Sequence, residues 1–353
     1  MTTRRLLILG PLFYLVVFFL YPLTAILARS LNADSLMGVG PFSALLTDSY
    51  YLERIWFTIW QATVSTLLTV AIGLPMAYLF AKHEFPGKTI LKAVSTIPFI
   101  MPTIVVAMGF LALIGPQGIV NSLLVGSFNF DAPPVRVTNT LLIIFMAHAF
   151  YNYSIVVRIV STYWANLSPR LEESAAMLGS GRFETFVHVT LPLLLPAIVS
   201  SAVLAFAFSF TSFGVVLILG GPEFATLEVV TYELAAKLFR LELAGALAII
   251  QLVFTYLILV VYTKFQAGTA VRVELVPREN TTTGRRRSRD TLYLCALIVG
   301  LLAILSPLWA LFERSISSGE GYSLVHFVSL VSNETGSYFY RSPLSVIGNS
   351  VRF

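Results

Sequence analysis

Two adjacent carboxylates, Glu172 and Glu173, open a polar segment that lies between two long apolar stretches. Ser168 and Pro169 precede them and predict a helix start, because serine can cap free amides and proline suits the first turn. The positive end of the helix dipole favours carboxylates in that turn. The chain holds no Ser/His/Asp grouping and no histidines at metal-ligand spacing, so the chemistry that we expect here is binding rather than catalysis.

Glycines at 179 and 181 predict a turn after this helix. Three apolar residues at helical spacing then predict a second short helix that packs against neighbouring spans: Phe183, Phe186 and Val187. We expect Pro192 and Pro196 to mark the re-entry into the apolar stretch. Two short helices about a glycine elbow suit a rigid lever, which moves the attached helices when a partner pushes on it.

The elements that must hold this segment are membrane helices. The chain is 57% hydrophobic and 12% charged, against about 25% charged residues in a soluble domain. Seven stretches carry no Asp, Glu or Lys and are long enough to cross a bilayer: 6–28, 55–81, 93–130, 137–157, 189–222, 243–263 and 291–312. Backbone groups in lipid must be satisfied internally, so we predict an all-α, polytopic membrane protein with seven spans.

The charged residues predict the orientation of these spans. With a cytoplasmic N-terminus, fifteen of the 23 basic residues and seven of the 18 acids fall on the cytoplasmic side. This positive-inside bias favours that orientation and attributes the net charge of +5 to topology rather than to nucleic-acid binding. We take the first stretch as a retained helix because no signal-peptide cleavage site follows it. The segment 168–192 is then cytoplasmic.

The segment has fixed points at Glu173, Ala175, Gly179 and the pair Leu191-Pro192. This spacing resembles the EAA loop of binding-protein-dependent ABC importer permeases, with Ser174 where the family usually has alanine. The resemblance implies that the segment docks on an ATPase subunit. The residues that it places in this coupling loop are Glu172, Glu173, Ala175, Gly179, Leu191 and Pro192.

The resemblance extends over about 51–265 and implies the transmembrane domain of a type I ABC importer. The stretch 220–232 resembles an outer segment of ferric-iron and thiamine permeases, which are often two fused halves. Iron(III) or thiamine is therefore the expected cargo, although polyamine and sulfate permeases share the loop. The family also implies delivery by a periplasmic or lipid-anchored binding protein, alternating access, and a bacterial or archaeal cytoplasmic membrane.

An internal repeat predicts the domain organisation. Residues 20–31 align without gaps with 305–316, sharing Leu, Pro, Leu, Ala, Arg and Ser, although Leu and Ala also recur by chance in apolar spans. We predict a complete permease domain at 1–265, a basic cytoplasmic linker at 266–290, and the truncated start of a second permease domain at 291–353. A second permease half is therefore an expected partner.

The chain contains no G-x-x-x-x-G-K-[ST] motif, because Lys82 stands where the first glycine would be required before Gly87. ATP and Mg²⁺ are therefore expected in a separate pair of ATPase subunits, with no cofactor, metal or catalytic residue in this chain. An ion-gradient-driven secondary transporter is the main alternative. It would usually carry an acid inside a span, and the apolar stretches contain none.

One span holds the polar residues His148, Asn152 and Tyr153. Polar residues at membrane depth usually face the bundle interior or a transport pathway, so these three are candidate pathway residues. Hydrogen bonding between helices would explain them equally well.

Overall fold

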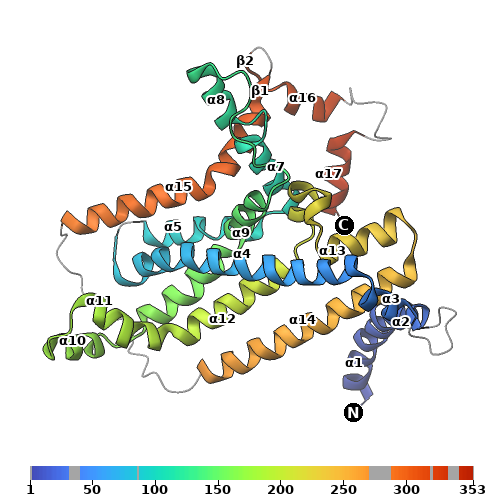
Figure 1. Cartoon of the computed structure of the whole chain (residues 1–353), viewed down its shortest axis with the longest axis horizontal. Coiled ribbons are helices and arrows are strands. Elements are labelled where there is room, and N and C mark those ends of the chain that lie inside the picture. The colour runs from blue at the N-terminus through green and yellow to red at the C-terminus, as the bar shows by residue number, and fades with distance from the viewer. Residues whose placement is uncertain are drawn as a thin grey trace. The chain divides into compact units, whose positions relative to one another are not determined.

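The computed structural model describes residues 2–31, 40–85, 87–269, 288–318, 321–332 and 342–352. Helices form almost all of this part of the chain (Figure 1). Within it, seven helical stretches are long and apolar enough to cross a membrane: Leu9–Ala28, Ser49–Lys82, Thr103–Phe128, Leu141–Ala165, Arg182–Phe210, Leu241–Gln266 and Leu297–Ile316. The predicted fold class and the predicted seven spans are therefore confirmed.

The first of two compact units comprises Met1–Ile100 and Asn139–Leu297. Its earlier α-helices are α1 (Thr2–Leu15), α2 (Tyr21–Leu31), α3 (Gly40–Thr47), α4 (Ser49–Lys82), α5 (Lys88–Val94) and α6 (Ile97–Ile100). Its later ones are α9 (Leu141–Ala165), α10 (Arg170–Met177), α11 (Arg182–Thr185), α12 (Leu191–Phe210), α13 (Leu227–Tyr232), α14 (Leu241–Thr269) and the start of α15 (Ser288–Ile316). Between them lie the π-helical segments η1 (Val16–Leu20), η2 (Phe186–Thr190), η3 (Val216–Gly220) and η5 (Glu233–Lys237), and the 3-10 turn η4 (Pro222–Phe224).

The core of this unit is the contact of α12 with α4, α9 and α14, and of α4 with α9 (Figure 1). Helices α4 and α9 approach closely at Gly73, where an added Cβ would lie 2.7 Å from the Cβ of Val156. Small residues permit such approaches between membrane helices, where packing replaces the hydrophobic effect as the attractive force. At 34 residues α4 is about 51 Å long, which is longer than a ~30 Å hydrocarbon core is thick.

The second compact unit comprises Met101–Thr138 and Ile298–Phe353. It contains α7 (Thr103–Ile114), α8 (Ile119–Phe128), the remainder of α15, the strands β1 (Ser317–Ser318) and β2 (Gly321–Tyr322), α16 (Val325–Ser332) and α17 (Pro343–Arg352). The strands pair antiparallel, with Ser317 opposite Tyr322. An added Cβ at Gly109 of α7 would lie 2.7 Å from the carbonyl oxygen of Pro307 in α15, so glycine is needed for this close packing.

The third apolar stretch, expected as one helix over 93–130, is divided among α5, α6, α7 and α8. Pro98 and Pro102 lack the amide hydrogen that a continuing helix requires. Pro98 lies in the first turn of α6, just after the break at Ser95 and Thr96, and Pro102 lies in the break between α6 and α7. A further break separates α7 from α8. There Asn121 donates its side-chain NH₂ to the carbonyl oxygens of Gly115 and Val135, both at 2.8 Å.

The span after the polar segment also differs from its prediction. Residues Arg182–Phe210 form one continuous helical stretch, and neither Pro192 nor Pro196 interrupts it. The π-helical turn η2 lies directly before Pro192, and the amide of Leu191 bonds to the carbonyl of Phe186. This wider turn accommodates the bond that Pro192 cannot donate.

The predicted domain boundaries remain a prediction. Both repeat copies are helical throughout, in η1 and α2 at 20–31 and in α15 at 305–316. Most of the predicted linker at 266–290 lies outside the described residues.

Candidate functional site

The polar segment forms two short helices where α9 ends and α12 begins (Figure 1). Helix α10 begins at Arg170, two residues after the expected cap Ser168, and its N-cap Pro169 makes no side-chain capping bond. Glu172 and Glu173 occupy its first turn as predicted. The second short helix α11 continues through η2 into α12, so any movement of this element reaches α12 directly.

Gly179 forms the elbow between α10 and α11. Its φ is +87°, a left-handed conformation that favours glycine, and nothing lies within 4 Å of a Cβ added there. The amide of Ser180 bonds to the carbonyl of Ala175 at 3.1 Å, and the amide of Gly179 bonds to that of Ala176 at 3.0 Å. This pair of bonds is a Schellman motif, which ends α10 and fixes the direction of the following chain.

Glu172 ties α10 to the two helices on either side of it. One carboxylate oxygen lies 2.7 Å from Nζ of Lys82, at the end of α4. The other accepts a hydrogen bond of 3.0 Å from the hydroxyl of Thr190, in η2 just before α12. The carboxylate therefore holds the short helix against two membrane spans at once.

Glu172→Ala is expected to loosen α10. The ion pair is about a third exposed and worth little by itself, but the substitution also removes the bond from Thr190. Together these interactions predict about tenfold faster amide exchange in α10, measured by hydrogen–deuterium exchange mass spectrometry. Glu173→Ala is the matched control. The Glu173 side chain is exposed and forms no ion pair in the described part of the chain, so unchanged exchange is expected.

An exchange rate in Glu172→Ala equal to that of the unchanged protein would contradict this role. The charge swap Lys82→Glu with Glu172→Lys distinguishes the interaction between these two residues from the other contacts that each side chain makes. It should restore part of the protection lost in each single variant, because residues in direct contact give non-additive effects.

Aromatic stacking anchors the base of the element. Phe186 stacks on the buried ring of Trp164, with ring centroids 6.0 Å apart and planes at 28°. Trp164 in turn contacts Tyr78 of α4 at 5.3 Å. The prediction that Phe186 packs against neighbouring spans is confirmed.

The tip of the element is apolar and exposed. Met177 and Leu178 are each 89% exposed, and Phe183 is 81% exposed. The prediction that Phe183 packs against the spans is wrong, because α11 turns this ring away from the bundle that holds Phe186. Exposed apolar side chains gathered on one element are typical of an interaction surface. We call these three residues the apolar tip.

The remaining predicted coupling residues line the sides of the element. Glu173 and Pro192 are exposed, whereas Ala175 and Leu191 are partly buried. Leu191 packs against the cluster that contains Trp164. Their role in coupling stays a prediction.

The three candidate pathway residues are buried in the bundle. His148 shares a 2.9 Å hydrogen bond with the hydroxyl of Ser65 in α4, and Asn152 donates to the hydroxyl of Ser209 in α12 at 3.1 Å. Tyr153 is fully buried, and its hydroxyl has no partner among the described residues. These bonds join three helices of the same unit, and a pathway role for the residues stays a prediction.

The stretch 220–232 is fastened to the ends of two spans. The hydroxyl of Thr58 in α4 accepts a 3.0 Å bond from the amide of Leu227, and Gln251 of α14 donates to Glu228 at 2.6 Å. Burial raises the pKa of Glu228, and the bond from Gln251 opposes that rise. No three His, Cys, Asp or Glu side chains in the described ranges are grouped as a metal site would require.

Residues 69–271 match the family model described as the binding-protein-dependent transport system inner membrane component. The chain is 29% identical over 252 residues to the sulfate transport system permease protein CysT of Escherichia coli, which covers 71% of this chain and 87% of that protein. It is 30% identical over 298 residues to the thiamine transport system permease protein ThiP of Salmonella typhimurium. That match covers 84% of this chain but 54% of the thiamine permease, so the chain spans about half of it.

Solved structures show the same fold. A bacterial ABC transporter that imports the acidic polysaccharide alginate aligns with a TM-score of 0.61 at 17% identity, over 76% of this chain and 95% of that one. The same kind of transporter, in complex with a periplasmic protein carrying an alginate pentasaccharide, gives a TM-score of 0.62. The predicted type I ABC importer fold is confirmed. This chain belongs to the family of binding-protein-dependent transport system inner membrane components.

Proposed function

We propose that this chain forms part of the membrane pathway of an ATP-driven importer and that residues 168–192 couple it to a separate ATPase subunit. The observation that carries the proposal is the geometry of that segment. It presents an exposed apolar tip, a rigid glycine elbow and a carboxylate fastened to both α4 and α12. A force applied to the tip would reach two spans of the bundle core.

The orientation follows from the charge distribution, which favours a cytoplasmic N-terminus and hence a cytoplasmic coupling segment. ATP and Mg²⁺ would bind in the partner, because the sequence contains no phosphate-binding loop of the G-x-x-x-x-G-K-[ST] type. A binding protein on the outer face would deliver the solute, as the match to a binding-protein-dependent family supports. ATP binding would then switch the pathway between inward- and outward-facing states.

The cargo that we propose is a small solute, with thiamine and iron(III) as the candidates that the 220–232 resemblance suggests. The thiamine permease match over 84% of this chain supports thiamine. The sulfate permease match over 71% of it supports an inorganic oxyanion equally well. A second permease half is part of the proposal, since the chain spans 54% of the thiamine relative.

Uptake by proteoliposomes tests the proposal. The chain would be reconstituted with its ATPase, a second permease half and the binding protein, and labelled thiamine, sulfate and iron(III) would be supplied in turn. We expect accumulation of one solute that requires both ATP and the binding protein. Uptake that persists without ATP and stops when an ion gradient is collapsed would show a secondary transporter instead. Omitting the second half should abolish uptake.

A further inference from the structure

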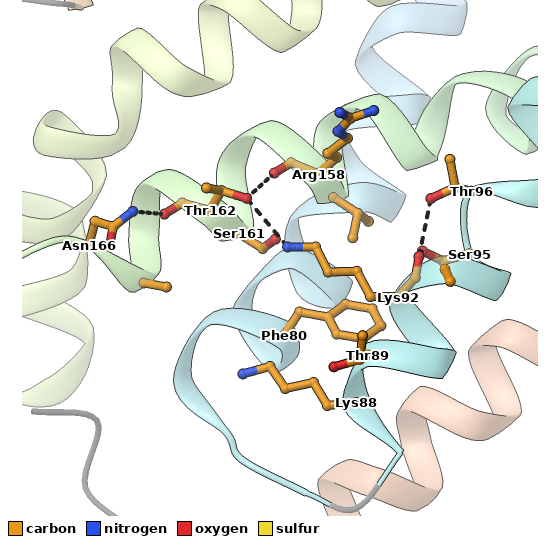
Figure 2. Close-up of a pocket in the computed structure, with 13 residues that line it drawn as sticks. Phe80, Lys88, Thr89, Lys92, Ser95, Thr96, Arg158, Ser161, Thr162 and Asn166 are labelled. Carbon is orange, nitrogen blue, oxygen red and sulfur yellow. Dashed lines mark hydrogen bonds between the residues drawn. The ribbon is translucent and has the colours of Figure 1, made fainter. Parts of the chain in front are cut away.

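A cavity of about 590 Å³ opens between the end of α4, helix α5 and the last turns of α9 (Figure 2). Its walls carry cations from two helices: Lys88 and Lys92 from α5, and Arg158 from α9. It lies within the first compact unit. No residue of the coupling element contributes to the lining, so the cavity is separate from the site described above.

The charge around this cavity is strongly positive. None of the residues that line it is acidic. Lys88 forms an ion pair with Glu84, which lies outside the lining, with its Nζ 2.7 Å from a carboxylate oxygen. The Arg158 side chain is exposed, and its guanidinium forms no ion pair with any residue that the structure describes. Like charges gathered at one place repel each other, and a bound anion removes that cost.

Hydroxyl groups lie on the same wall as the cations. Lys92 extends from α5 toward α9 and donates to the hydroxyl of Thr162 at 3.3 Å (Figure 2). Ser161, beside it on α9, is 2% exposed, and its hydroxyl has no hydrogen-bond partner among the described residues. A buried hydroxyl without a partner is costly, so its position in the lining itself points to a missing acceptor.

The size of the cavity restricts the ligand. Its volume exceeds the needs of one bare ion and falls in the range of small-molecule sites. Phe80 and Val157, both buried, give it an apolar floor. The cavity therefore suits an anionic group attached to a larger body.

We propose that this cavity binds a phosphate group, held by Lys92 and Arg158 with the hydroxyl of Ser161. Phosphate oxygens accept the charge-assisted bonds that lysine and arginine donate. The group could belong to an anionic phospholipid headgroup or to a free phosphate. Anionic lipids are attracted to basic residues at the cytoplasmic ends of membrane helices, which is where the charge bias places α5.

Binding there would join α5 to α9 next to the coupling element. Asn166, the last of the lining residues, lies four residues before Arg170, where α10 begins. An occupied cavity would hold the end of α9 against α5 and so steady the base from which the coupling element extends.

The test uses the full chain in a neutral detergent. Retention of phosphatidylglycerol is measured by native mass spectrometry, and binding of inorganic phosphate by titration calorimetry. Lys92→Gln and Arg158→Gln are each expected to weaken binding about tenfold, because each removes one charge-assisted bond. Lys264→Gln is the matched control. It removes an exposed charge in the last turns of α14, outside the lining of the cavity, and should bind as the unchanged protein does.

The two ligands identify the source of the group. Saturable retention of the lipid with no phosphate binding assigns a headgroup site, and phosphate binding alone assigns a soluble ligand. Lys92→Arg should bind as well as the unchanged protein, which separates loss of charge from a folding defect. The proposal is overturned if neither ligand binds, if the double variant of Lys92 and Arg158 binds normally, or if Lys264→Gln loses binding equally.

Discussion

Gly179→Pro is expected to abolish solute uptake while leaving the chain inserted in the membrane. The φ of +87° at this position is out of reach of proline, whose ring fixes φ near −65°. Proline also removes the amide that bonds to the carbonyl of Ala176. The direction of the chain after α10 then changes. The apolar tip therefore loses its native orientation relative to Glu172, and the ATPase meets a different surface. Uptake in proteoliposomes and membrane insertion would be measured on the same preparation.

Gly179→Asn is the matched control for this substitution. Asparagine tolerates left-handed backbone better than other residues with a side chain, and an added Cβ at Gly179 would meet nothing within 4 Å. We therefore expect this variant to keep most of the uptake. Glu173→Lys should also abolish uptake, since it reverses the charge of an exposed carboxylate in the coupling segment. Normal import by Gly179→Pro with the ATPase bound would refute the coupling role of residues 168–192.

Local residue chemistry predicted the spans and the elbow. Long apolar stretches must be helical in lipid, and Gly179 followed by Gly181 allows the turn that the structure shows. Whether a helix continues or breaks at a given proline was less predictable. Pro192 was expected to mark the re-entry into the apolar stretch, but it lies inside a helical stretch that continues from α11 through the π-helical turn η2. Pro98, by contrast, lies in the first turn of α6, and Pro102 lies directly before α7.

Contacts between residues far apart in sequence could not be predicted from one sequence. Lys82 and Glu172 are 90 positions apart, and neither is unusual where it stands, since lysine is common at helix ends and glutamate in first turns. The direction of Phe183 was also beyond prediction, because helical spacing gives the face of a helix but not the partner that the face meets. The cavity lined by Lys92 and Arg158 likewise depends on the packing of α5 beside α9.

The apolar tip gives the second large expected effect. Leu178→Asp and Phe183→Asp are each expected to weaken the affinity for the ATPase about 30-fold or more. Both side chains are almost fully exposed in this chain, so their substitution costs the fold little. Burying a carboxylate without a partner in an interface is costly, and large apolar anchors at an interface centre contribute about 2 kcal/mol or more. Affinity would be measured by biolayer interferometry with the chain held in nanodiscs.

Two controls make this prediction specific to the tip. Leu324→Asp places the same charge at a leucine that is 62% exposed but lies after the last span, on the face predicted to be external, and should leave the ATPase affinity unchanged. Phe183→Leu keeps an apolar side chain and should lose much less affinity than Phe183→Asp.

A crosslink tests the same contact directly. Because Cys295 is the one cysteine of the chain, a Cys295→Ser background with Met177→Cys allows crosslinking to a cysteine on the ATPase. Undiminished affinity in both aspartate variants, together with no crosslink from position 177, would place the ATPase contact elsewhere on this chain.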